Sequence, residues 1–165
     1  MKKTILCSLV LIFSLAIFAQ DFSVPTNYKL EAPADFKTYE PDMLNGLDWL
    51  ITTPITTELD KRKNVNTFVL AWMMGSPDVT IEVTQEVVTF LECDQCLMIF
   101  MGGWAKYAVQ NNYSNDKVMG NFSGVESVIQ FYKNNQGKMP KNTGIEKYMK
   151  LQGKGKLKKH IKSKV

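Results

Sequence analysis

The sequence predicts an all-α, single-domain protein, a bundle of about five or six short helices with at most a token strand near residues 79–84. Three observations support this fold class. Apolar residues recur at three- and four-residue steps in several segments, as they do on one face of a helix. Glycine and proline separate those segments. The chain also lacks the regular alternation of strands and helices that builds a parallel sheet.

Residues 1–20, MKKTILCSLVLIFSLAIFAQ, are predicted to be a signal peptide. Lys2 and Lys3 precede an apolar run that ends at Ala19, a small residue near the expected cleavage point. The run is shorter than the roughly 20 residues that a spanning helix needs. We therefore expect export to the periplasm or the extracellular space, where disulfides persist. About 145 residues then remain, enough for one hydrophobic core.

Residues 21–33 contain two prolines and no apolar period, which predicts an extended lead-in. A helical domain is expected over 34–152. Its first helix should cover 35–52, in one or two pieces, because Pro41 suits the first turn of a helix. Thr52-Thr53-Pro54 marks its end.

The next predicted helix carries Val65, Phe68 and Trp72 on one face. The polar residues 59–64 are either a turn or the exposed start of this helix. Gly75, followed closely by a proline, marks its end, since glycine adopts the left-handed cap and proline cannot continue the helix.

Residues 79–92 carry two overlapping patterns. Apolar and polar residues alternate from 79 to 84, as in a strand. Val87, Val88 and Leu91 then step as on a helix. We expect an extended piece that turns into a helix at about Gln85.

The clearest helical pattern covers 97–110, with two more helices expected over 118–132 and 145–151. Gly102 and Gly103 interrupt the first of these at a cost of about 1 kcal/mol each relative to alanine. Close approach of a neighbouring helix is the simplest compensation.

Charge divides the chain into two parts. Residues 21–140 carry nine basic and 15 acidic side chains, whereas nine lysines and one acid, Glu146, follow from 141 onward. Residues 153–165 are expected to form a basic, mobile tail, because Gly153 and Gly155 disfavour a helix. The tail can solubilise the chain, contact acidic surfaces or fold back on the acidic body. Nucleic acid is disfavoured because no aromatic residues interleave the lysines. These lysines are Lys154, Lys156, Lys158, Lys159, Lys162 and Lys164.

Cys93 and Cys96 form a C-x-x-C pair before an apolar run. A thiol-disulfide enzyme places such a pair at a helix N-terminus, which lowers the pKa of the first thiol. The chain lacks the βαβ alternation that accompanies that motif, and Asp94 should raise the thiol pKa. Met139-Pro140 is the only downstream X-Pro pair that could face the cysteines. A local disulfide or two structural thiols is the favoured interpretation, and a redox pair is the alternative.

Metal and cofactor chemistry finds little support, and we predict neither. Leu97 stands where a c-type haem site needs histidine, and His160 is the only histidine in the chain. Methionine next to an apolar helix is more often core filler than a ligand. The one conceivable soft-metal set for copper(I) is Cys93, Cys96, Met98 and Met101.

The aromatic residues offer a binding hypothesis. Trp49, Trp72 and Trp104 all fall on predicted helices, where they pack in the core or, if they face outward, anchor a ligand or partner. The best place for a binding site is the stretch FMGGW, whose two glycines should leave a dent in the helix. The candidate binding residues are Phe100, Gly102, Gly103 and Trp104.

The Lys-led signal ending in AQ and the stretches TFVLAWMMGSPDV, LMIFMGGWAKYAVQN and GVESVIQFYKNN carry a resemblance. They are similar to the small, functionally uncharacterised exported helical proteins common in Bacteroidetes. This resemblance implies a helical, exported protein and no particular activity. FVLAWMMG and VESVIQFY also resemble segments of the helical immunity proteins that bind type VI amidase effectors. The cysteines of those proteins have no counterparts at these places, so no residue roles are carried over.

The sequence thus predicts an exported, non-enzymatic helical protein that binds a protein partner or a small ligand. A thiol-disulfide oxidoreductase that uses Cys93 and Cys96 is the alternative. A third class is an envelope-associated protein held by its lysine tail.

Overall fold

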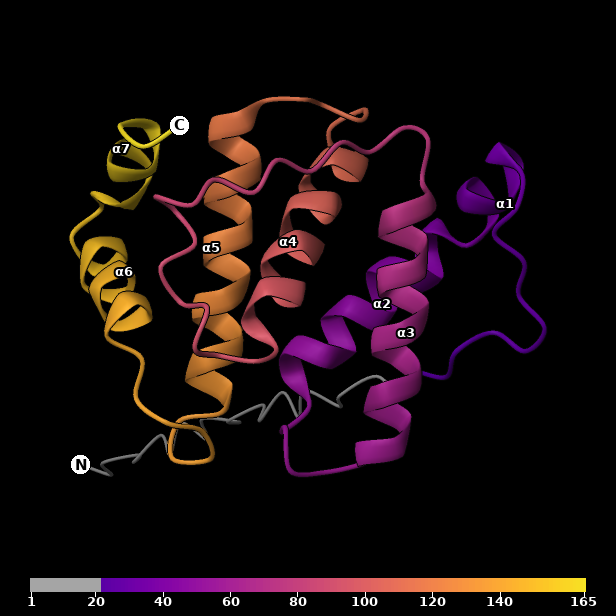
Figure 1. Cartoon of the computed structure of the whole chain (residues 1–165), viewed down its shortest axis with the longest axis horizontal. Coiled ribbons are helices and arrows are strands. Elements are labelled where there is room, and N and C mark those ends of the chain that lie inside the picture. Colours follow the sequence, from indigo (N-terminus) through magenta and orange to yellow (C-terminus); the bar gives the residue numbers. More distant parts are fainter. Residues whose placement is uncertain (1–21) are drawn as a thin grey trace, which may run out of the picture.

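The first helical segment is broken in two in the computed structural model, which describes residues 22–165 (Figure 1). Helix α1 covers Pro33–Thr38, helix α2 covers Glu40–Thr52, and Tyr39 lies between them. Each helix has a proline in its first turn, where a missing N–H group leaves no helical hydrogen bond unmade. The predicted signal peptide lies outside the described residues.

Three longer helices follow. Helix α3 covers Leu59–Gly75 and ends at the predicted glycine, so residues 59–64 are the start of this helix, mostly exposed but with Arg62 buried. Helix α4 covers Cys96–Gln110 and helix α5 covers Lys117–Asn134. The side chain of Asp116 caps α5 by accepting a hydrogen bond from the backbone of Met119.

The helix expected from Gln85 is not formed. Residues 76–95 have no helix or strand and run from α3 across α4 and α5 to the C-terminal helices (Figure 1). Eight of the 11 residues from 79 to 89 are β-branched, which lowers their helix propensity. The segment instead buries single apolar side chains, including Val87, Val88 and Phe90. It contacts helix α6 (Thr143–Gly153) where the Tyr148 hydroxyl donates to the Val87 carbonyl at 2.6 Å.

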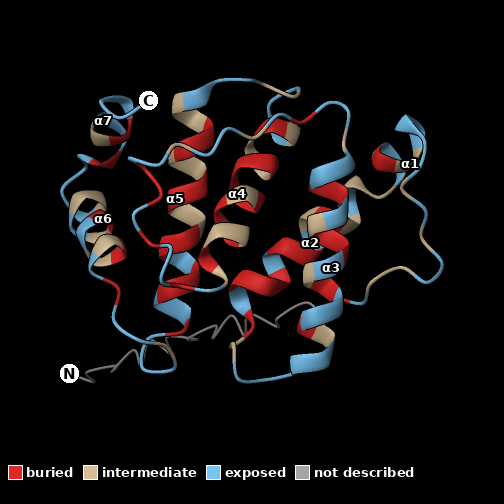
Figure 2. Ribbon diagram, in the orientation of Figure 1, coloured by how far each residue is buried: buried red, intermediate tan, exposed pale blue. Residues whose placement is uncertain are grey.

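The core lies mainly between α2, α3, α4 and α5, whose facing sides are buried (Figure 2). Helix α4 packs along α5, and α2 contacts α3, α4 and α5. Trp49, Trp72 and Trp104 are all buried, which confirms the packing interpretation of the tryptophans. The indole N–H of Trp72 donates to the carbonyl of Phe36 at 2.8 Å and thereby ties α3 to α1.

The C-terminal segment, predicted as a mobile tail from residue 153, is folded. After α6, Gly155 takes a positive φ of 64°, and helix α7 covers Leu157–Lys162. Leu157 is 2% exposed and Ile161 is fully buried, and α7 contacts α5 and α6. Two apolar side chains four residues apart lie on one face of a helix, so even this short helix can bury both. The helical domain therefore extends beyond 152.

The predicted all-α fold is confirmed for residues 22–165, which form seven helices and one isolated bridge between Gln136 and Met139. Residues 79–84 are extended without pairing into a sheet. Among the described helices, none has both the length and the apolar character that crossing a bilayer requires.

Candidate functional site

The predicted binding dent in FMGGW is filled by the protein itself. Phe100 is fully buried, Trp104 is 1% exposed, and both glycines are buried. A Cβ atom on Gly102 would collide with the side chain of Leu47 from α2. A Cβ atom on Gly103 would collide with Ser127 and lie 2.8 Å from the carbonyl of Ser123, both on α5. The glycines allow close helix contact rather than leaving a dent for a ligand, which corrects the prediction.

Two further glycines on α5, which the sequence analysis did not single out, complete this contact. Gly120 faces the indole of Trp104, and a Cβ on Gly124 would lie 2.6 Å from the ring of Phe100. The α4 aromatics therefore pack onto α5 glycines, while an α5 serine packs onto an α4 glycine. The four-residue spacing of Gly120 and Gly124 is a sequence signal for close helix approach that could have identified them.

Beside this contact lies a groove of about 430 Å³. Gly103, Ile51 and Ile129, all buried, form its floor. We call it the α2–α4–α5 groove, since α2, α4 and α5 supply most of its lining, together with Gln152 of α6. Its polar lining is Asp48, Lys106, Tyr107, Gln110, Ser123, Glu126, Ser127, Gln130, Lys133 and Gln152.

The charged groups of this groove are engaged with one another. The ammonium of Lys106 donates to both carboxylate oxygens of Asp48, at 2.6 and 2.8 Å. Lys133 donates to the Gln152 side-chain oxygen at 3.1 Å, and the Gln152 amide donates to Glu126 at 3.3 Å. Two lysines and two acids thus leave the groove without net charge.

The remaining polar groups of the groove are open to a ligand. Within residues 22–165, five of its side chains make no hydrogen bond to the protein. They combine hydroxyl and amide groups, which both donate and accept. These five are Tyr107, Gln110, Ser123, Ser127 and Gln130.

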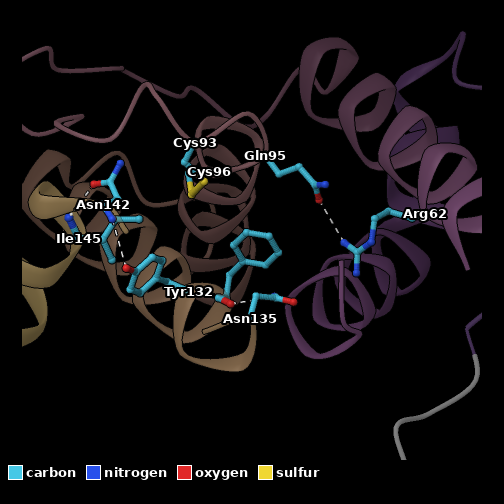
Figure 3. The surroundings of a disulfide bond; sticks show 9 residues. Arg62, Cys93, Gln95, Cys96, Tyr132, Asn135, Asn142 and Ile145 are labelled. Carbon is cyan, nitrogen blue, oxygen red and sulfur yellow. Dashed lines mark hydrogen bonds between the residues drawn. A yellow bond between two sulfur atoms is a disulfide. The ribbon is translucent and has the colours of Figure 1, made fainter. Parts of the chain in front are cut away.

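Cys93 and Cys96 form a disulfide at the start of α4, with their Cα atoms 5.3 Å apart (Figure 3). Cys93 is 8% exposed, whereas Cys96, the first residue of α4, is fully buried. Cys93 lines a second hollow of about 190 Å³ together with Phe131, Met139 and Pro140. The fold thus brings the X-Pro pair singled out in the sequence beside the more accessible cysteine, although without a cis peptide bond in residues 22–165.

A buried arginine secures the loop that carries this disulfide. Arg62 of α3 is 3% exposed and donates to the side-chain oxygen of Gln95 at 3.2 Å (Figure 3). It also donates to the carbonyls of Leu50 and Thr53, at the end of α2. Burial lowers the pKa of the Arg62 guanidinium, and the nearby charge of Glu58 opposes this. Arg62 therefore joins the C-terminal end of α2 to the start of α4.

Two of the four sulfur atoms considered, and disfavoured, as copper(I) ligands are not free to bind a metal. The two cysteines are joined as a disulfide, and Met98 lines a separate hollow of about 350 Å³ with Arg62 and Gln95. Within residues 22–165, no group of three or more histidine, cysteine or acidic side chains is placed to bind a metal ion. His160 lies against the ring of Tyr148 on α6, with the ring centroids 6.0 Å apart.

Comparison with known proteins adds no assignment, because no family model, curated protein or solved structure matches this chain.

Proposed function

We propose that this is an exported, non-enzymatic binding protein whose ligand is a small, neutral, hydroxyl-rich molecule held in the α2–α4–α5 groove. The observation that carries the proposal is the set of five side chains that line one groove with no hydrogen-bond partner in the described part of the chain. Polar side chains that line a concavity fix the orientation of a small ligand and give it specificity.

The class of ligand follows from size and charge. A volume of about 430 Å³ lies within the usual range for small-molecule sites, roughly 300–1,000 Å³. Lys106 and Asp48 already neutralise each other, so a charged ligand would have to break that pair. Hydroxyl groups match serine and glutamine side chains in both directions of hydrogen bonding.

The test is a titration of the ¹⁵N-labelled protein, followed by NMR, with glucose, N-acetylglucosamine, maltose and trehalose. At least one sugar should shift the amide signals of Gly103 and Ser127. The double variant Gln110→Ala/Gln130→Ala should weaken that binding about tenfold, since a lost hydrogen bond costs roughly 0.5–1.5 kcal/mol.

Gln85→Ala is the matched control, because Gln85 is exposed on the segment between α3 and α4 and lies outside the groove lining. It should bind like the unmodified protein. The proposal is wrong if none of the four sugars shifts the groove signals, or if the shifts lie elsewhere on the molecule.

A second candidate function, a thiol-disulfide oxidoreductase, is favoured by one observation, the hollow beside Cys93. In that proposal a thiolate of a partner protein attacks the Cys93 sulfur, and the Cys93–Cys96 bond breaks. Cys96 leaves as a thiolate at the start of α4, where the helix dipole stabilises negative charge, and then takes up a proton. A second partner thiol resolves the mixed disulfide, so the partner is oxidised by two electrons.

The two proposals are separated by the reduction potential of the disulfide, measured in thiol buffers with a thiol count by mass spectrometry. An oxidoreductase should fall between about −270 and −120 mV. A structural disulfide should lie below about −300 mV. In that case the variant Cys93→Ala should leave sugar binding unchanged, as the binding proposal requires.

A further inference from the structure

We propose that the exposed lysines of α6 and α7 form a docking surface for an anionic lipid bilayer. The inference starts from charge distribution. Residues 141–165 carry nine lysines against the single acid Glu146, and all nine lysines are exposed. Residues 22–140 carry 14 acidic and nine basic side chains. The molecule therefore has a strongly positive end and a negative body.

The lysines of the two parts differ in their pairing. In the body, Lys37 pairs with Asp78 at 3.0 Å, and Lys117 pairs with Glu82 at 2.7 Å. Within the described residues, none of the nine C-terminal lysines forms an ion pair. Their charge is not neutralised by ion pairs and is available to a partner outside the molecule.

The positive charges are held on an ordered surface. Leu157 and Ile161 anchor α7 in the core, and His160 contacts the ring of Tyr148. Because the apolar face of α7 is buried, its lysines project outward from a fixed backbone. An ordered surface loses less conformational entropy on docking than a mobile tail would. Six lysines lie on the α6–α7 turn, α7 and the residues after it: Lys154, Lys156, Lys158, Lys159, Lys162 and Lys164.

The chemistry of this surface favours lipid headgroups. Tyr148, the one aromatic residue of the segment besides His160, is 1% exposed, so no stacking platform for single-stranded nucleic acid exists here. Leu157 and Ile161 face inward, so they cannot insert into the acyl region. Headgroup phosphates require only positive charge at the surface, which a cluster of lysines supplies. Repulsion of the acidic body should orient the molecule with α6 and α7 toward the bilayer.

The test is flotation of the full chain, without residues 1–20, with vesicles of phosphatidylcholine that contain a minority of phosphatidylglycerol. The protein should float with these vesicles and not with pure phosphatidylcholine. Binding should disappear when salt rises from ~0.1 M to ~1 M, since the Debye length then falls from about 10 to about 3 Å. Retention at ~1 M salt, or equal binding to both vesicle types, would overturn the proposal.

A quadruple variant tests which lysines bind the anionic vesicles. Replacing Lys156, Lys158, Lys159 and Lys162 with glutamine should weaken binding by roughly 100-fold or more, given the contribution of each lysine near an anionic surface. The matched control removes four exposed lysines from the body and should bind nearly as the unmodified protein does. The control replaces Lys29, Lys37, Lys63 and Lys117 with glutamine.

Both variants carry the same net charge. An equal loss of vesicle binding in the two would show that binding depends only on total charge, and it would overturn the proposal that α6 and α7 form the docking surface. Circular dichroism should report unchanged helix content, because all eight lysines are exposed. Single-stranded DNA is the competing probe. If it binds the C-terminal lysines while the anionic vesicles do not, the lipid assignment is wrong.

Discussion

The α4–α5 pair and the α6–α7 pair both differ from what their sequences suggest, and they differ in opposite directions. In α4–α5, glycines beside aromatic residues suggest a binding dent, yet Phe100 and Trp104 are core residues. In α6–α7, glycines among lysines suggest a mobile tail, yet Leu157 and Ile161 hold a helix in place. Glycine therefore has to be interpreted through its partners. In the first pair it admits a neighbouring helix, and in the second Gly155 makes the turn between two helices.

The largest expected effect on stability is in the C-terminal segment, which the sequence predicts to be mobile. Ile161→Ala should lower the free energy of unfolding by about 2–5 kcal/mol, the range for removing a fully buried isoleucine side chain. Urea denaturation measures this loss. Val165→Ala is the control in the same segment, because Val165 is 42% exposed and its truncation should change stability by less than about 0.5 kcal/mol. Equal, small effects in both variants would mean that α7 does not pack on the core.

The next largest effect on stability is expected at a glycine of α5. Gly124→Ala should cost about 1–3 kcal/mol of stability, because the added methyl group meets the ring and the backbone carbonyl of Phe100. Gly153→Ala, at the end of α6, has open space around the new Cβ and should leave stability unchanged or slightly raised. Both changes remove a helical glycine, so the comparison isolates the α4–α5 contact. A stabilising Gly124→Ala would contradict it.

A smaller effect is expected at the start of α6. The side chain of Asn142 accepts a hydrogen bond from the backbone of Ile145 at 3.1 Å and caps the helix. Asn142→Ala should lower the unfolding free energy by about 1 kcal/mol. The variant Asn142→Asp should retain most of the stability, since aspartate caps helices equally well. If both variants lose the same amount, the cap is not what Asn142 contributes.

The smallest effect is a pH dependence at α7. Burial lowers the pKa of His160 below its ordinary 6.5, and the charges of Lys147 and Lys164 lower it further. The unfolded chain therefore binds a proton at a higher pH than the folded protein. The contribution to stability is complete above about pH 7 and should decline as the pH falls through 6.5 toward the lowered value. Unfolding at pH 5 to 8 should show a shallower slope for His160→Gln.

Much of the fold could be predicted because the main helices have regular periods. Residues 97–110 and 118–132 have apolar stripes, and the glycine before Pro77 ends α3 as expected. No helix forms from Gln85, because the low helix propensity of the β-branched residues outweighs the helical spacing of Val87 and Leu91. The core position of the valines comes from tertiary contacts such as the one to Tyr148, which no local pattern encodes.

The candidate site was harder to predict. Its lining comes from α2, α4, α5 and α6, and serine or glutamine on a helix surface carries no signal of shared location. Gly103 is the only member of the predicted binding set that lines the groove, and it forms part of the floor. Helix α7 gives a weak signal in the sequence, because its one pair of buried apolar residues, Leu157 and Ile161, stands among six lysines.

The central claim is that the C-terminal lysines belong to an ordered surface. The most direct test is the heteronuclear ¹H–¹⁵N NOE of the backbone amides of α7, compared with those of α5 in the same sample. We predict similar values for Ile161 and for the middle of α5, because both are anchored by buried side chains. Values near zero or negative from residue 154 onward would show a mobile tail and contradict the account.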